Sequence, residues 1–374
     1  MNKDVINKRL EITHAPNEAH FTQSTRAPYQ TYEYLADILA REVKGRRQDT
    51  DDGALGTIDL LLTSLFIGAH VLLEDYPGSG KTFLAKVLAN SIDFNEGSPD
   101  HMSGYQRVQC MVDLLPTDIT GTELKERDQW VLSYGPIFSH VLLVDEINRT
   151  TPRVQAAFLE AMAEKQITIS RRTLLLEPVF FLIATQNPFD RAGTFELPYA
   201  QLDRFLFKRV LTPLKPEDLR AVISMNYDSS AERPAPVKMH ELLSAMGRLN
   251  RPLVSREIED DLLSLHKHFT RRVSTGDKAD TTRVIAPECS LSPRTLRLFK
   301  RAVDFRVNLD EERTGSPKAY SAERHLTPLL IDLLRHRITL SSRTSGAAEV
   351  LLEIKRITQD VLEESLQRQR ARST

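Results

Sequence analysis

Four short apolar runs, separated by segments of helical pattern, constrain the fold of this 374-residue chain most strongly. The runs are HVLLE at 70–74, RVQCMV at 107–112, HVLLVDE at 140–146 and VFFLIATQNP at 179–188. Apolar runs of this length with helices between them are typical of a parallel sheet that helices cover on both faces. The pattern therefore predicts an α/β domain with a parallel sheet between two layers of helices.

The pattern changes beyond the last run and predicts a second, smaller domain. From about Glu217 onward the segments are almost all helical, so we expect an α/β core at 31–212 and an all-α lid at 213–374. Residues 1–30 are polar and lack a sustained period, which predicts a flexible N-terminal arm. The last segment predicts an amphipathic helix from the spacing of four apolar residues, which are Val350, Ile354, Ile357 and Val361.

Composition and charge exclude several classes of protein. The 50 Lys and Arg residues nearly balance the 51 Asp and Glu residues, so no basic field favours nucleic acid or an acidic membrane surface as partner. Cys110 and Cys289 lie outside any disulfide or zinc spacing and are interpreted as buried thiols in a reducing compartment. The amino terminus lacks signal-peptide features, and the longest apolar stretch, 58–73, is too short and too interrupted to span a bilayer. We therefore expect a cytoplasmic protein.

The stretch DYPGSGKTF follows the first apolar run and leads into a helical pattern. A glycine-rich loop between a strand and a helix offers backbone N–H groups to a polyphosphate, which predicts an ATP-binding loop. Lys81 would reach the β and γ phosphates, and the Thr82 hydroxyl would bind Mg²⁺. A chance glycine turn is the alternative, and the strand and helix around the loop disfavour it. The residues expected to bind the nucleotide are Asp75, Tyr76, Pro77, Gly78, Ser79, Gly80, Lys81, Thr82 and Phe83.

Asp75 occupies the position at which the pattern G-x-x-x-x-G-K-S/T begins with glycine. Asp tolerates unusual backbone angles better than most residues, so the turn can still form. Its carboxylate would repel a triphosphate nearby. We therefore expect weaker ATP binding than in an Asp75→Gly variant.

Polar side chains end the third and fourth apolar runs. Asp145 and Glu146 follow a buried run, at the carboxyl end of a strand where open α/β sheets place ligands. Asp145 is suited to the Mg²⁺ shell and Glu146 to accepting a proton from an attacking water. A pair of solvated charges at a helix start is the alternative. Asn187 ends the next run and could orient the water, although Asn before Pro is also a common turn.

Several longer phrases, in the same order, resemble one family, the MoxR group of AAA+ ATPases, over roughly residues 35–365. The phrases are GAHVLLEDYPGSGKT (68–82), DLLPTDITGTEL (113–124), GPIFSHVLLVDEINRTTPRVQAAFLEAMAEKQITI (135–169), ATQNPFDRAGTFELPYAQLDRF (184–205), LSPRTL (291–296) and LLRHRI (333–338). The resemblance implies a P-loop AAA+ core that is followed by a helical lid.

The resemblance also implies roles for single residues. Arg204 matches the arginine finger that reaches the γ-phosphate held by the neighbouring subunit, and Arg294 matches the sensor 2 arginine that the lid brings over the nucleotide. An arginine supplied in trans makes hydrolysis depend on assembly. Taken alone, both arginines would more often form surface salt bridges. The Walker A, Walker B and sensor 1 matches are Lys81 with Thr82, Asp145 with Glu146, and Asn187.

Some segments depart from the family. The segment 166–179 matches a helix-2 insert, a β-hairpin facing the pore of a ring, but SRR replaces a glycine pair at its turn. The hairpin could therefore be tighter, longer or differently twisted, with Arg171 and Arg172 at the pore or simply solvated. Tyr199 replaces a glutamate, Ser290 replaces a glycine, and DTDDGALGTID lacks a GQE-like stretch near the adenine. We expect divergence in subunit contacts and nucleotide affinity.

The resemblance implies a homo-oligomeric ring, of six subunits, that hydrolyses ATP with Mg²⁺. The ring would remodel, mature or assemble a partner protein, and the family's usual partners are separate polypeptides with von Willebrand factor A domains. A nucleotide-gated binding module with little turnover is one alternative, which the presence of Glu146, Asn187 and Arg204 disfavours. A DNA-associated motor is another, which the near-neutral charge disfavours.

Overall fold

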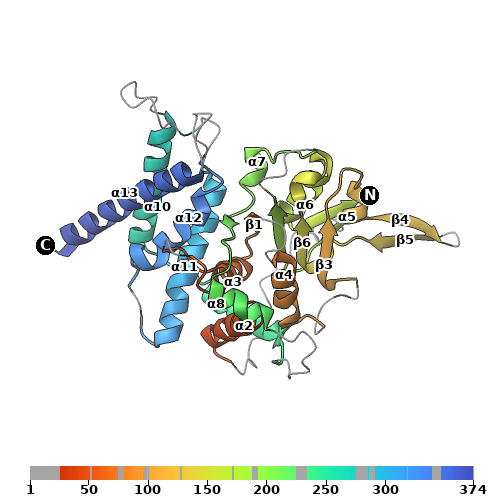
Figure 1. The fold of residues 1–374 in the computed structure, drawn as a ribbon, viewed down its shortest axis with the longest axis horizontal. Helices are drawn as coiled ribbons and strands as arrows, with labels where there is room; N and C mark the ends of the chain where they lie inside the picture. The colour runs from red at the N-terminus through yellow and green to blue at the C-terminus, as the bar shows by residue number, and fades with distance from the viewer. Residues whose placement is uncertain are drawn as a thin grey trace, which may run out of the picture.

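The computed structural model describes most of the chain from residue 26 onward. The described residues are 26–50, 53–74, 80–95, 99, 101–126, 129–170, 172–187, 193–224, 234–274, 285, 291–317, 319–338 and 347–373. The predictions for the N-terminal arm up to residue 25, and for Cys289 and Ser290, lie outside these residues. Figure 1 shows a core that contains the sheet on one side and the helices α10 to α13 on the other.

A five-stranded parallel sheet forms the centre of the core in the part of the chain that the structure describes. Its order is β10 (Phe207–Val210), β1 (Val71–Glu74), β9 (Phe181–Gln186), β6 (Ser139–Asp145) and β3 (Ser103–Gln109). The predicted parallel sheet is thus confirmed. The second run forms an earlier strand than its apolar residues indicated, and β10 was not predicted because it contains Lys208 and Arg209.

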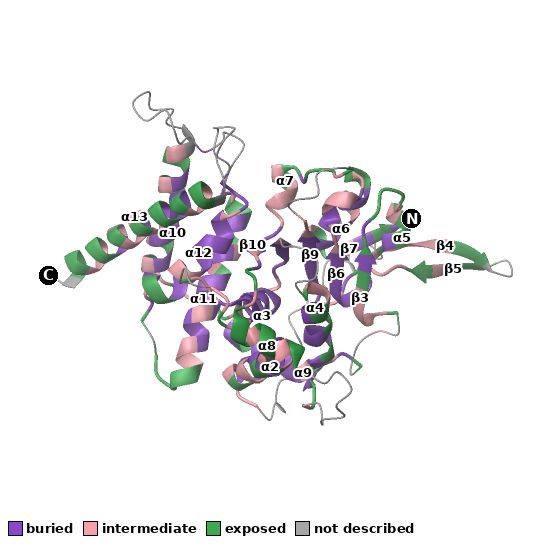
Figure 2. Cartoon of the chain, viewed as in Figure 1, coloured by how far each residue is buried: buried purple, intermediate pink, exposed green. Residues whose placement is uncertain are grey.

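Helices cover both faces of this sheet, as predicted, because successive strand residues point to opposite sides. Leu73 belongs to a core that also contains Leu61 of α3 (Thr57–Ile67) and Leu84 of α4 (Lys81–Asn90). Leu72 belongs to the core of the other face, with Phe158 of α6 (Pro152–Glu164). Figure 2 shows the strands β6 and β9 as buried between these layers. The α/β fold class is therefore confirmed.

The helix α2 (Pro28–Glu42) begins earlier than the apolar pattern indicated. Pro28 occupies its first turn, where the missing N–H of proline costs nothing and its fixed φ suits the helix. Tyr32 is buried against Phe66 and Phe305, and its hydroxyl donates to Asp59 Oδ1 at 2.9 Å. The helix thereby joins α3 to the helical region that follows the sheet.

Two β-hairpins extend from the core. One is β7 (Gln166–Ile169) with β8 (Arg172–Leu175), where Ile169 pairs with Arg172 across a two-residue turn. Ser170 in that turn has φ +55°, in the left-handed region that a glycine would adopt more easily. Arg171 lies outside the described residues. Arg172 Nε lies 3.4 Å from Glu123 Oε1 of the other hairpin, so its charge is partly paired.

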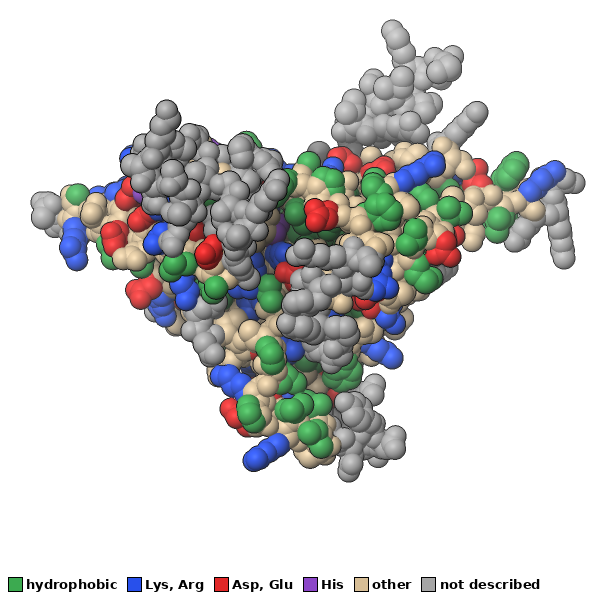
Figure 3. All heavy atoms as spheres, turned by 45° about the horizontal axis from the view of Figure 1, so that its top comes forward, with side chains coloured by type: hydrophobic (Ala, Val, Ile, Leu, Met, Phe, Trp, Pro, Cys, Tyr) green, Lys and Arg blue, Asp and Glu red, His purple; other side chains and the backbone are tan. Residues whose placement is uncertain are grey.

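The other hairpin, β4 (Gly121–Glu126) with β5 (Gln129–Tyr134), was not predicted. It projects from the core on the side away from the helical region (Figure 1), and Figure 3 shows hydrophobic side chains along it. It follows the short helix α5 (Pro116–Thr120), which is the second helix after the phosphate loop in chain order. The hairpin expected within 166–179 is present as β7–β8, and its assignment as the helix-2 insert stays a prediction.

The region after the sheet is mainly helical, as predicted, and the short strand β11 (Val237–Lys238) is an exception to the all-α expectation. The helices of this region are α8 (Pro216–Ile223), α9 (Met239–Leu249), α10 (Arg256–Ser274), α11 (Pro293–Thr314), the π-helix η3 (Ala322–Leu326), α12 (Thr327–Leu334) and α13 (Ala347–Ser373). The amphipathic pattern of α13 is also confirmed, because Ile354, Ile357 and Val361 are buried. A short pair of strands, β2 (Ile92–Asp93) and β11 (Val237–Lys238), ties the start of this region to the core.

A buried ion pair joins the sheet to α12. Arg209 Nε donates to Asp332 Oδ1 at 2.8 Å, and its Nη2 donates to Asp332 Oδ2 at 2.6 Å. Both side chains are at most 2% exposed. This pair fixes the helix along the edge strand of the sheet.

Among the described helices, none is long and apolar enough to cross a membrane.

Candidate nucleotide site

The helix α4 begins at the predicted phosphate loop. Gly80 has φ +86° and forms its N-cap, and Lys81 and Thr82 are the first two helical residues. Asp75 to Ser79 lie outside the described residues, so their predicted contacts stay predictions. Phe83 is 40% exposed. The N–H groups of the first turn and the positive end of this ten-residue helix suit an anion.

Asp145 ends β6, and its carboxylate is held by two neighbouring strands. Thr185 Oγ1 of β9 donates to Asp145 Oδ1 at 2.6 Å, and Arg107 Nη2 of β3 lies 2.6 Å from Asp145 Oδ2. Neither Thr185 nor Arg107 was predicted as a site residue. Both lie near the carboxyl ends of parallel strands, and only the strand order brings them beside Asp145.

Glu146 has an unusual backbone conformation, with φ +58° and ψ +52°. A non-glycine residue in this region costs about 1–3 kcal/mol and often marks a functional site. Its backbone N–H donates to Thr185 Oγ1 at 2.9 Å, which fixes the turn. Its Oε2 lies 3.2 Å from Gln109 Nε2 and 3.3 Å from Arg149 Nε, two further contacts that the sequence did not predict.

Asn187 follows β9 and lines a cavity of about 520 Å³. Glu74 at the end of β1 also lines it and is held by two partners. Gln186 Nε2 donates to Glu74 Oε1 at 2.8 Å, and Lys208 Nζ lies 3.0 Å from Glu74 Oε2. The predicted residues Asp145, Glu146 and Asn187 therefore lie at the carboxyl edge of one sheet, as their positions after strands indicated.

A second cavity, of about 400 Å³, lies between the core and the helical region. Asp49, Thr50 and Ala54 line it from the segment before α3, and Val210 and Thr212 line it from the end of β10. Arg335, just after α12, lines both this cavity and the one beside Asn187. This cavity adjoins the segment in which the sequence lacked a GQE-like stretch.

The oxygen donors fit Mg²⁺ bound together with a nucleotide. Thr82 supplies a hydroxyl and Asp145 a carboxylate, and Mg²⁺ is usually held by one or two such groups plus phosphate oxygens and waters. Within the described ranges no cluster of three or more His, Cys, Asp or Glu could hold a metal by itself. Arg107 at Asp145 Oδ2 would have to share that oxygen or release it.

Arg204 lies at the opposite edge of the sheet from Glu74, the residue that ends β1. It belongs to a turn between α7 (Tyr199–Leu202) and β10, and the N–H of Leu206 donates to the carbonyl of His70, just before β1. The loop follows Glu74, at the other end of β1. Four extended residues separate the two ends by about 13 Å. Within one subunit, the backbone of Arg204 therefore lies at the end of the sheet away from Glu74.

Arg294 lies at the same edge as Arg204. It is exposed in the first turn of α11, and Ser292 at the N-cap of that helix donates to Asp203 Oδ2 at 2.6 Å. His70 is near enough to feel its charge: burial, together with the charges of Lys165 and Arg294, lowers the pKa of His70 to about 3. The role of Arg294 over the nucleotide, which the resemblance implies, stays a prediction.

The other predicted features near the site are partly described. Cys110 is a buried free thiol, as predicted, and burial beside Asp145 and Glu146 raises its pKa to about 12. Tyr199 is half-buried and lines the cavity beside Asn187. Tyr199 begins α7, the short helix that leads to Arg204. The sequence alone did not show that it lies beside Asn187.

Comparisons with known proteins concern mainly this core. Residues 70–207 match the ATPase family associated with various cellular activities (AAA). Over 151 residues the chain is 46% identical to the uncharacterized protein YeaC of Bacillus subtilis, a match that covers 40% of the chain and 44% of YeaC. It is 38% identical over 168 residues to chaperone MoxR1 of Mycobacterium tuberculosis, covering 44% and 42%. Protein MoxR of Paracoccus denitrificans is 39% identical over 173 residues, covering 44% and 48%.

The matches span less than half the length of each of these relatives. A crystal structure of a presumed ATPase from Cytophaga hutchinsonii is similar over a longer range, covering 88% of this chain and 94% of that one, with a TM-score of 0.68 and 26% identity. The family match, the two MoxR relatives and the fold agree with the motifs in the sequence. The core of this chain is therefore similar to the AAA family of ATPases and, within it, to proteins named MoxR.

Proposed function

We propose that this chain is a subunit of a ring that hydrolyses ATP with Mg²⁺ and uses the cycle to remodel, mature or assemble a partner protein. The observation that carries the proposal is the placement of Arg204 and Arg294 at the edge of the sheet opposite the phosphate loop. The groups proposed for phosphoryl transfer are thus divided: the phosphate and metal ligands lie at the carboxyl edge of the sheet, and the two arginines lie at the opposite edge. They meet only when a second subunit brings its arginines to the loop of the first.

Each residue at the loop edge has a defined task in this proposal. The N–H groups of the loop and Lys81 hold the phosphates, and Thr82 and Asp145 hold Mg²⁺. Bound Mg²⁺ neutralises charge on the phosphates. Asn187 orients the attacking water, and Glu146 accepts its proton. Thr185 bonds to both Asp145 and Glu146, so it keeps metal ligand and base at a constant separation.

The nucleotide base is proposed to enter the cavity lined by Asp49, Thr50 and Val210. This cavity lies between the core, at 31–212, and the lid, at 213–374, so its shape depends on the position of the lid. We propose six subunits for the ring, with Arg204 and Arg294 both acting on the nucleotide of the neighbour. The ring would work in the cytoplasm.

The partner is proposed to be a separate protein that contains a von Willebrand factor A domain. Support comes from the family, since the relative from Mycobacterium tuberculosis is named a chaperone. The projecting β4–β5 hairpin, with Trp130 62% exposed and Val131 43% exposed, offers a hydrophobic surface for contacts outside the subunit.

One contact favours a second candidate, a nucleotide-gated binding module with little turnover. Arg107 occupies one oxygen of Asp145, the proposed metal ligand. If this ion pair persists with ATP bound, Mg²⁺ would bind weakly and the chain would hold nucleotide without rapid hydrolysis.

Phosphate release measured at increasing protein concentration tests the two candidates. We expect the rate per subunit to rise with concentration, because the site is complete only between subunits, and to fall to background in Glu146→Gln. Arg204→Ala should lower kcat by about 10³-fold, the lower end for an arginine finger, and leave binding of a fluorescent ATP analogue nearly unchanged. Arg248→Ala, which removes an exposed lid arginine paired with Glu312, is the control and should leave the rate unchanged.

Wild-type release no faster than that of Glu146→Gln would refute hydrolysis and leave the binding module. Loss of nucleotide binding in Arg204→Ala would place Arg204 at the nucleotide of its own subunit, contrary to the proposed division between two edges.

A further inference from the structure

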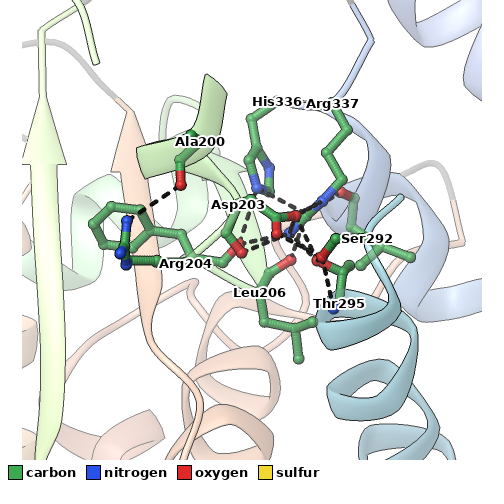
Figure 4. Close-up of polar contacts among 10 residues, drawn as sticks. Ala200, Asp203, Arg204, Leu206, Ser292, Thr295, His336 and Arg337 are labelled. Atoms are coloured by element: carbon green, nitrogen blue, oxygen red, sulfur yellow. Dashed lines mark hydrogen bonds and ion pairs between the residues drawn. The ribbon is translucent and has the colours of Figure 1, made fainter. Parts of the chain in front are cut away.

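Asp203, the residue before Arg204, is the centre of a polar network that joins the core to the lid (Figure 4). Its carboxylate accepts hydrogen bonds from Ser292 Oγ at 2.6 Å and from Thr295 Oγ1 at 2.5 Å. Ser292 is the N-cap of α11, and its Oγ also accepts from the N–H of Thr295. Arg294 stands between these two hydroxyl residues. The carboxylate of Asp203 therefore bonds to residues before and after Arg294 in the chain, and Asp203 itself directly precedes Arg204.

Arg337 completes the network from the end of α12. Its side chain is 3% exposed, and Nη2 lies 3.4 Å from Asp203 Oδ1. It donates from Nη1 to the carbonyl of Leu206 at 3.0 Å and from Nη2 to the carbonyl of Phe205 at 3.0 Å. These carbonyls belong to the two residues after Arg204. The backbone of Arg204 is therefore held on one side by Asp203 and on the other by Arg337.

Arg337 remains charged near neutral pH. Burial lowers its pKa to about 10, and the Asp203 carboxylate opposes that shift. Its further bond from Nη1 to the carbonyl of Leu333, at 2.7 Å, fixes the guanidinium to α12, the helix that precedes it. A lysine has no planar fork and could not donate to all of these acceptors together.

The side chain of Arg204 is not part of this network. In Figure 4 it points away from Ser292 and Arg337, toward Ala200. Its Nη1 donates to the carbonyl of Ala200 at 3.3 Å, and its buried Nε has no hydrogen-bond partner in the part of the chain that the structure describes. The network thus fixes the backbone from which the guanidinium extends and leaves the guanidinium available to a ligand.

We propose that Asp203 and Arg337 are positioning residues that hold Arg204 and Arg294 as one rigid pair, which the subunit presents to the nucleotide of its neighbour. This inference rests on the proposed function, ATP hydrolysis with arginines in trans. Neither Asp203 nor Arg337 touches the nucleotide. They set the separation of the two arginines, and they make that separation depend on contact between lid and core.

The first test is the steady-state kinetics of Asp203→Asn at a protein concentration that saturates assembly. The substitution keeps the size of the side chain but removes the charge opposite Arg337. Displacing a reacting group by about 1 Å can cost about 100-fold, so we expect kcat to fall about 10-fold to 100-fold. The KM for ATP should change less than about twofold, because the subunit's own phosphate loop is untouched. Thr295→Val, which keeps the Asp203–Arg337 pair, should show a smaller fall of the same kind.

Asp310→Asn is a matched control. Asp310 lies on the same helix as Thr295, and its side chain is 23% exposed, as is that of Asp203. Its partners are Arg324 and His325, within the lid. Its substitution should leave kcat unchanged, whereas a fall equal to that of Asp203→Asn would show that the effect is not specific to Asp203 and would overturn the positioning role.

The decisive test mixes subunits. A Glu146→Gln subunit cannot activate water but presents intact arginines, whereas an Asp203→Asn subunit retains Glu146 but presents misplaced arginines. If Asp203 acts on the neighbour's nucleotide, a 1:1 mixture assembled with ATP and Mg²⁺ should regain about a quarter of wild-type activity. This is the fraction of head-to-tail interfaces that combine an intact base with intact arginines. An Arg204→Ala subunit mixed with Glu146→Gln serves as the reference.

The outcomes separate the two proposals. If the Arg204→Ala mixture regains activity and the Asp203→Asn mixture does not, the positioning role is overturned and the trans arrangement stands. The positioning role is also overturned if Asp203→Asn alone keeps wild-type kcat. If the Arg204→Ala mixture fails to regain activity, the trans arrangement is refuted, and the inference with it.

Discussion

The buried ion pair between Arg209 and Asp332 allows a quantitative prediction about stability. Removing the carboxylate in Asp332→Ala leaves the guanidinium of Arg209 almost fully buried, with Asp49 Oδ1 at 3.8 Å from Nη1 as a distant carboxylate. Breaking a buried pair by removing one partner typically costs about 3–5 kcal/mol. The bidentate contact, at 2.8 and 2.6 Å, supports a cost in this range. We expect the free energy of unfolding to fall by about that amount.

The assay is urea unfolding followed by circular dichroism at pH 7, with two comparison variants. Asp260→Ala removes one partner of the exposed Arg372, whose side chain is 46% exposed, and should cost less than about 1 kcal/mol. Arg209→Met combined with Asp332→Leu removes both charges, and should be close to wild type in stability because neither desolvated charge remains.

Two results would refute this reasoning. A loss below about 1 kcal/mol in Asp332→Ala would show that water or Asp49 compensates the guanidinium, and that the pair behaves like a surface pair. A double variant as unstable as Asp332→Ala would show that the cost comes from lost packing between α12 and β10, and not from an unpaired charge.

Three further predictions concern pH, nucleotide affinity and assembly. Burial lowers the pKa of His70 to about 3, so the unfolded chain binds a proton at this residue before the folded chain does as the pH falls below 6.5. The free energy of unfolding should therefore drop by up to about 1.4 kcal/mol per pH unit toward pH 3. Urea titrations at several pH values should show a shallower slope in His70→Gln. Asp75→Gly should bind ATP more tightly by calorimetry, because it removes a carboxylate near the triphosphate, and equal or weaker binding would contradict the argument. Trp130, the only tryptophan of the chain, should shift its fluorescence to shorter wavelength when ATP and Mg²⁺ drive assembly, and an unchanged spectrum would leave the β4–β5 hairpin outside the interfaces.

The strands that could be predicted from the sequence are those that carry no buried charged side chain in need of a partner from a distant segment. β1, β6 and β9 are almost wholly apolar, so each is recognisable by itself. β10 is not, because Lys208 and Arg209 resemble a surface segment. Their charges are neutralised by Glu74 and Asp332, which lie more than a hundred residues away along the chain and close to β10 only in the folded protein.

The candidate site divides in the same way. Asp145, Glu146 and Asn187 were predictable because a polar residue at the end of a buried strand must lie at the carboxyl edge of the sheet. Arg107 and Thr185 were not, since their contacts with Asp145 depend on the order of the strands. That order is set by non-local pairing, which a local pattern does not contain.

The sequence by itself therefore determined the fold class, the similarity to one family of ATPases, and the positions of Asp145, Glu146 and Asn187 at one edge of the sheet. Only the tertiary structure decided where Arg204 and Arg294 lie. The chain returns across the sheet after Asn187 to begin β10 at the opposite edge, and Asp203 and Arg337 fasten the lid there. The direction of that crossing and the partners of those buried charges are set by contacts between distant segments, and these exist only once the chain has folded.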